Sequence, residues 1–103
     1  MLKMMKQAQE MQSRLQQIQD DLQNATVTGT AGGGMVTAEA DGKGTIKRVR
    51  INPGVVNPTD VDGLEDLVTL AVADAQIKAI DYAQAEMQKL TGGLDLPFKL
   101  PGL

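Results

Sequence analysis

The side chains that could do chemistry in this sequence are cations rather than catalytic groups. There is no histidine and no cysteine, and Ser13 is the only serine among 103 residues. Imidazole acid–base chemistry, disulfides and cysteine-based zinc sites are therefore excluded, and Ser13 has no base near it in the sequence to activate it. The sequence predicts that the protein is not an enzyme and holds no metal or cofactor.

Two glycine-rich segments, residues 32–34 and 42–45, superficially resemble phosphate-binding loops. Lys43 is not followed directly by Ser or Thr, no six-residue glycine spacing precedes it, and the segment is typical of a hairpin rather than of a strand-to-helix turn. Acidic pairs such as Asp60 and Asp62 lack the twelve-residue calcium pattern and are better explained as helix caps. We therefore expect no small-molecule substrate.

Basic residues gather in two segments of a chain whose net charge is −3. Residues 1–19 contain three cations against Glu10 alone, and residues 43–50 contain four cations and no acid, whereas residues 57–86 are strongly acidic. Local basic patches suit phosphate-led binding of DNA with weak sequence preference, although solvated surface charge is an alternative explanation. The candidate DNA contacts are Lys3, Lys6, Arg14, Arg48 and Arg50.

The element that must position the first cations is a long helix over residues 1–25. Apolar residues recur there at alternating three- and four-residue spacing, and neither proline nor glycine occurs before Gly29. Such a helix would be roughly 37 Å long, too long for a small domain to cover, so we expect a second copy of the chain as its partner. The predicted seam consists of Met4, Ala8, Met11, Leu15, Ile18 and Leu22, with Met1 and Ala25 at its ends.

Three short strands and a second helix are expected after it. Residues 27–30, 35–40 and 45–51 favour strands, and the turns at 31–34 and 41–44 predict an antiparallel meander. The second helix is expected to begin at Thr59 or at Asp62, where Asp62 and Glu65 would form a capping box, and to end near Leu90. We expect one α+β domain over residues 1–93 and an irregular apolar tail, residues 94–103, that either docks or stays disordered. No secretory signal or membrane span is expected.

A four-residue hairpin loop over 41–44 would place Ala38 opposite Lys47 and Val36 opposite Val49. These residues would face the core, with Lys47 extending outward at an edge. Ile46, Arg48 and Arg50 would then share the open face with Glu39, where an ion pair with Glu39 is the alternative to DNA contact.

Several segments together closely resemble the YbaB/EbfC family of small bacterial nucleoid-associated proteins. They are MKQAQEMQ (5–12), VTG (27–29), GGMV (33–36), RVRINP (48–53), LEDLV (64–68), DA (74–75) and LPFK (96–99). The resemblance implies a three-stranded antiparallel sheet between an N-terminal and a C-terminal helix, and a homodimer whose helices project like tweezers. It also implies a cytoplasmic protein of the nucleoid that binds double-stranded DNA and influences gene expression. A coiled-coil adaptor or chaperone-like protein-binding module is the alternative that the heptads leave open.

Overall fold

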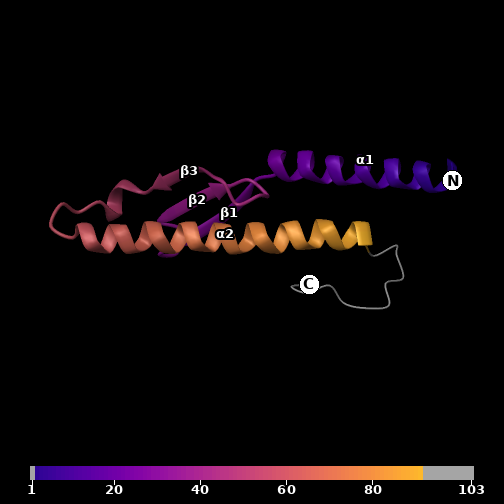
Figure 1. The fold of residues 1–103 in the computed structure, drawn as a ribbon. Helices are drawn as coiled ribbons and strands as arrows, with labels where there is room; N and C mark the ends of the chain where they lie inside the picture. Colours follow the sequence, from indigo (N-terminus) through magenta and orange to yellow (C-terminus); the bar gives the residue numbers. More distant parts are fainter. Residues whose placement is uncertain (1, 92–103) are drawn as a thin grey trace.

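The computed structural model describes residues 2–91 and has the expected α+β architecture (Figure 1). Met1 and the predicted apolar tail lie outside the described residues. The elements in chain order are α1 (Leu2–Asn24), β1 (Val27–Ala31), β2 (Val36–Ala40), β3 (Ile46–Ile51), the short 3₁₀ helix η1 (Pro53–Val55) and α2 (Val61–Thr91). The strands form one antiparallel sheet in the order β1-β2-β3, as the sequence predicts.

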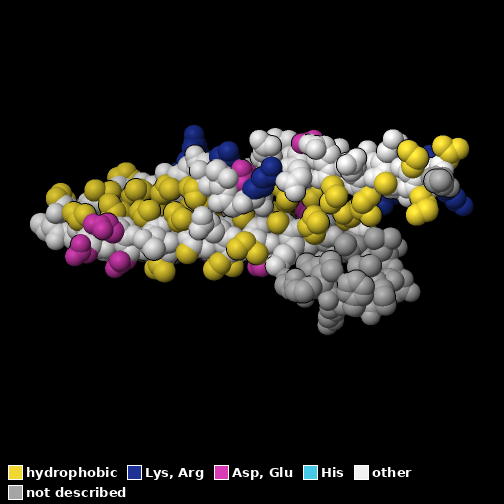
Figure 2. Space-filling model, viewed as in Figure 1, with side chains coloured by type: hydrophobic (Ala, Val, Ile, Leu, Met, Phe, Trp, Pro, Cys, Tyr) yellow, Lys and Arg dark blue, Asp and Glu magenta, His cyan; other side chains and the backbone are white. Residues whose placement is uncertain are grey.

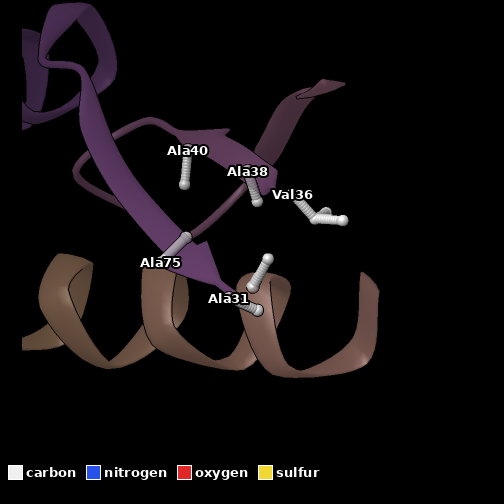
Figure 3. Packing of buried hydrophobic residues seen from close by; sticks show 6 residues of the cluster. Ala31, Val36, Ala38, Ala40 and Ala75 are labelled. Atoms are coloured by element: carbon white, nitrogen blue, oxygen red, sulfur yellow. The ribbon is translucent and has the colours of Figure 1, made fainter. Parts of the chain in front are cut away.

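One face of the sheet packs on α2, and the core between them is made of small residues. Val36, Ala38 and Ala40 of β2 are buried, whereas the alternate residues Thr37 and Glu39 lie on the opposite, open face. From α2, Ala71 and Ala75 join this cluster, and Ala79, at the same four-residue spacing, is also buried. Figure 3 shows the side chains of Ala31, Val36, Ala38, Ala40 and Ala75 gathered between the two layers.

Gly29 marks the place where β1 and α2 approach most closely. A Cβ atom at Gly29 would overlap the backbone nitrogen of Ala75 and the backbone oxygen of Ala71. Backbone atoms cannot move aside as a side-chain rotamer can, so only glycine fits here. This contact fixes how β1 lies across α2.

The predicted register of the β2–β3 hairpin is wrong by two residues. Ala38 pairs with Val49 and Val36 with Ile51, and a bulge leaves Lys47 as the extra residue, so that Ile46 pairs with Ala40. A two-residue shift preserves which face each side chain occupies, and Arg48 and Arg50 therefore lie on the open face as predicted. Ile46, beyond the bulge, packs against the core instead of sharing that face.

The physical reason for the shift is a longer loop, held together by Asp41. The Asp41 N–H donates a hydrogen bond to the Thr45 carbonyl oxygen at 3.0 Å and closes the loop at residue 45. β3 therefore begins at Ile46. The Asp41 carboxylate accepts hydrogen bonds from the N–H groups of Lys43 at 2.9 Å and Thr45 at 3.0 Å. Gly44 has a φ of +90°, which favours glycine.

The first residue of α2 is Val61, and its N-terminal cap is Asp60 rather than Asp62. Asp60 Oδ1 accepts a hydrogen bond from the Gly63 N–H at 3.1 Å, the geometry of an N-cap to the third helical residue. The expected Asp62 capping box is therefore wrong. A turn precedes the helix, in which the Asp60 N–H donates a hydrogen bond to the Asn57 carbonyl oxygen at 2.9 Å. This turn places Asp60 directly before the first residue of α2.

α1 projects from the sheet and gives the molecule its elongated shape. At its C-terminal end Leu22 is buried, and the Leu22 carbonyl oxygen accepts a hydrogen bond from the Gly42 N–H of the hairpin loop at 2.7 Å. From there α1 extends beside the C-terminal part of α2, in the opposite direction (Figure 1). The molecule measures 69 × 25 × 16 Å with a radius of gyration of 19.0 Å, whereas a compact domain of this length has a radius of gyration of about 13 Å.

Candidate nucleic-acid interface

The three predicted cations of α1 lie along one side of that helix. At 100° per residue, Lys3, Lys6 and Arg14 fall within a sector of about 80°, and the helical rise spreads them over about 16 Å. All three side chains are exposed, and none makes an ion pair within residues 2–91. We call these three residues the basic stripe of α1; its charges are free to meet anions.

The predicted apolar seam of α1 lies on a different side of the helix and is covered only towards its C-terminal end. Leu22 is buried and Ile18 and Met11 are half-buried, whereas Leu15 is 37% exposed and Met4 is 73% exposed. A groove of about 230 Å³ separates α1 from α2 near this covered end. It is lined by Arg14, Gln17 and Ile18 from α1 and by Glu86, Lys89 and Leu90 from α2.

The other two predicted cations stand on the open face of the sheet, away from α2. Arg48 lies opposite Glu39 in the register but makes no ion pair within the described part of the chain. Arg50 Nε lies 3.9 Å from Glu39 Oε1, and the Arg50 side chain is 63% exposed. The pairing with Glu39 is thus real for Arg50, although it is long and solvated, and such pairs contribute little free energy.

Sequence reasoning did not select Lys43 and Lys47 as candidate contacts, although both belong to the basic segment that it identified. Lys43 is exposed in the hairpin loop, and Lys47, at the bulge, has its Nζ 3.6 Å from Asp41 Oδ2. The bulge turns Lys47 out of the core face to which the expected register assigned it. With Arg48 and Arg50, these lysines make the β3 side of the sheet a second basic region (Figure 2).

Two aspartates with lowered pKa values hold the scaffold on which these cations stand. Burial raises the pKa of Asp41. Hydrogen bonds from the Thr45 and Lys43 N–H groups and the charge of Lys47 together lower this pKa by more than burial raises it, so the pKa of Asp41 lies below its ordinary value of 3.8. A hydrogen bond from Lys78 and another from the Thr30 N–H lower the pKa of Asp74 below the same value. The latter bond, 2.9 Å long, satisfies an N–H of the edge strand β1. Both carboxylates thus have structural partners.

Among residues 2–91 no group of three or more potential metal ligands is found. Neither described helix is long and apolar enough to cross a membrane. What the described surface offers to a ligand is therefore positive charge on α1 and β3, together with apolar side chains.

Comparison with known proteins agrees with this surface. The model of the YbaB/EbfC DNA-binding family matches residues 1–94. A nucleoid-associated protein of Gemmatimonas aurantiaca is 52% identical over 101 residues, covering 98% of this chain and 97% of that protein. Another, from Thermoanaerobacter pseudethanolicus, is 48% identical over 94 residues, covering 91% of this chain and 85% of that protein.

The fold also matches a crystal structure, that of uncharacterized protein HP0035 from Helicobacter pylori. The TM-score is 0.64 at 16% sequence identity, covering 88% of this chain and 91% of that chain, so this likeness bears on the fold alone. The match of the family model over nearly the whole length and the identities above 45% establish the relationship. The chain belongs to the YbaB/EbfC DNA-binding family.

Proposed function

We propose that this protein binds double-stranded DNA as a homodimer, mainly through phosphates, and thereby organises the bacterial nucleoid and influences gene expression. The observation that carries the proposal is the basic stripe of α1, three exposed cations with no ion-pair partner within residues 2–91. Family membership and the names of the nucleoid-associated relatives support the same function. Arg48 and Arg50 would supply further phosphate contacts from the sheet.

Low sequence specificity follows from the kind of contact that these residues offer. A lysine ammonium on a flexible stem acts as a point charge towards phosphate, and phosphate contacts position a protein on the duplex without reporting base identity. Arg48 and Arg50 stand on a strand within a flat face whose neighbours are Thr37 and Glu39, not on an element that projects into a groove. We therefore expect similar affinity for unrelated duplexes.

Apolar residues on one side of the core are not covered by α2, and this exposure supports the proposed homodimer. α2 packs mainly under β1 and β2, so Val49 and Ile51 on the inner face of β3 are 37% and 39% exposed. Leu64 and Val68 of α2 pack against the core but are only half-buried, and Figure 2 shows the apolar strip between β3 and α2. We call these four residues the β3–α2 strip. A second copy packed on it would extend the core, as in obligate dimers, and would add a second basic stripe.

The test is a pair of double variants that remove the same charge from different places. Lys3→Gln with Lys6→Gln removes two charges from the basic stripe; Lys78→Gln with Lys89→Gln removes two from α2, where both lysines are paired with acids. Because each lost phosphate contact lowers the salt slope by about one and a dimer loses four such contacts, the first variant should bind duplex DNA at least about 100-fold more weakly at low salt. Fluorescence anisotropy measures the affinity, and circular dichroism confirms folding.

The control variant should bind within about threefold of wild type, since only the long-range field changes. Equal losses in both variants would mean that net charge, not the basic stripe, governs binding. Unchanged affinity of the first variant would remove α1 from the interface.

A further inference from the structure

α2 has a second apolar stripe that faces away from the sheet. Leu70, Ala73, Ile77 and Ile80 follow three-four-three spacing, and the three large side chains are 60%, 58% and 57% exposed. Apolar side chains project along this outer edge of α2 in Figure 2. Because Ala71, Ala75 and Ala79 are buried on the opposite side of this helix, α2 is apolar on two sides, which is typical of a helix that is buried in an assembly.

The chain itself carries a surface that complements this outer stripe. The more exposed half of the α1 seam, Met4 to Leu15, has the same spacing and about the same length. Met4 and Leu15 are 73% and 37% exposed, and Met11 between them is half-buried. The net charges beside the two stripes are opposite. Asp81 and Asp74, the latter paired with Lys78, border the α2 stripe on one side, and Lys3 and Arg14, with Glu10 between them, border the α1 seam on one side.

α1 cannot reach the outer stripe of its own chain. Leu22 and Gly42 anchor its C-terminal end, and the groove between the helices shows Arg14 and Ile18 beside Glu86 and Leu90. From that groove α1 continues away from the sheet, towards its N-terminal end at Leu2 (Figure 1). Ile77 lies about 20 Å back along α2 in the other direction. An α1 helix that covers the outer stripe must therefore come from a second copy.

We propose that the exposed half of α1 packs in parallel on the outer α2 stripe of a copy in a neighbouring dimer. Aligning Leu15 with Ile77 sets Ala8 against Leu70 and Met11 against Ala73, so that small residues oppose large ones. Arg14, which precedes Leu15 in the heptad, then lies beside Asp81, which follows Ile80. This is the flanking charge pair of a parallel helix pair, and an antiparallel pair would not form it.

The contact joins different surfaces of the two copies, so it does not close after one pair and can propagate from dimer to dimer. It leaves Lys6, on the opposite side of α1, free for phosphate. Linked dimers would present the Lys6 side chains of several copies to DNA and could bridge separate duplexes. The inference rests on the proposed homodimer for its building block but uses different residues, and the two can fail separately.

Sedimentation velocity without DNA, from low to high micromolar chain concentration, tests the contact. Wild type should form species above the dimer, which has twice the chain mass of 11.0 kDa. Ile77→Ser with Ile80→Ser should weaken this further association about tenfold or more while leaving the dimer intact, because both side chains are exposed. Leu2→Ser is the matched control, since Leu2 is 85% exposed and lies on α1 opposite the seam.

A charge exchange tests the orientation. Arg14→Asp should weaken association beyond the dimer, and Arg14→Asp combined with Asp81→Arg should restore it. Wild type that stops at the dimer at every concentration, serine variants that assemble as wild type does, or a charge exchange that restores nothing would each overturn the proposal. A wild type that grows by single chains instead of by dimers would support the stripe contact and contradict the proposed homodimer.

Discussion

At the scale of single residues, Asp41 determines how the basic end of β3 is presented. Its carboxylate closes the hairpin loop, lies near Lys47, and stands next to Gly42, which holds α1 through Leu22. The loop, the bulge and the anchored C-terminal end of α1 therefore lie around one ionised group. Such a carboxylate could not be identified from the sequence, because Asp-Gly in a hairpin is equally compatible with a shorter turn.

The lowered pKa values of Asp41 and Asp74 predict acid sensitivity. In both cases the folded state binds its proton less readily than the unfolded state, where the pKa is close to 3.8. The stabilisation is therefore present above about pH 4 and is lost as the pH falls through the lower folded-state values. Thermal unfolding measured between pH 7 and pH 2 should show the melting temperature falling at the acid end of this range.

Asp41→Asn should lower the melting temperature at pH 7 and reduce the fall in melting temperature at acid pH, because the amide replaces one of the two carboxylates with lowered pKa values. Asp62→Asn, in the first turn of α2, is the control and should retain the full fall. An Asp41→Asn profile parallel to that of wild type would refute the role assigned to this carboxylate.

Gly29 allows a second residue-scale prediction. Gly29→Ala forces a methyl group into the backbone of Ala71 and Ala75, so the free energy of unfolding should fall by about 3 kcal/mol or more, beyond ordinary overpacking. Chemical denaturation measures this loss. Thr28→Ala, one residue away on the exposed face, should change it by about 0.5 kcal/mol or less. A loss of similar size in both variants would show that the close approach is not what matters.

At the scale of elements, the helices and strands could be predicted within one or two residues because their periodic signals are strong. The small residues of α2 are compatible with close packing on a sheet or on another helix, and the structure packs Ala71 and Ala75 against the buried residues of β2. The faces of Arg48 and Arg50 were predicted correctly for a physical reason: an even register shift does not change the side of a strand. The register itself could not be predicted, because it depends on the Asp41 loop and the bulge at Lys47.

Incomplete coverage of the sheet by α2 leads to a prediction about assembly. Val49→Glu places a charge in the β3–α2 strip, where the side chain is 37% exposed in a single chain, so the chain should fold but fail to dimerise. Light scattering should then give the mass of one chain. Thr28→Glu, on the opposite face of the sheet, should remain a dimer. A dimeric Val49→Glu variant would place the dimer contact elsewhere.

At the scale of the whole molecule, the distribution of charge matters more than the net value of −3. Most cations of the described residues stand on α1, which extends from the sheet, and on the β3 side, whereas half of the acids lie on α2 (Figure 2). Segregated charge was visible in the sequence. The direction in which α1 projects could not be predicted, because it depends on the contact between Leu22 and Gly42, which are twenty residues apart in the chain.

The central claim, that a dimer binds duplex DNA through phosphates, is tested most directly by its dependence on salt. Fluorescence anisotropy with two unrelated labelled duplexes would give the affinity at about 50 and about 200 mM salt. If a dimer neutralises about six phosphates, the affinity should fall roughly a thousandfold over this range and differ little between the duplexes. Absence of binding at the lower salt concentration, or tight binding to one duplex with little salt dependence, would contradict the account.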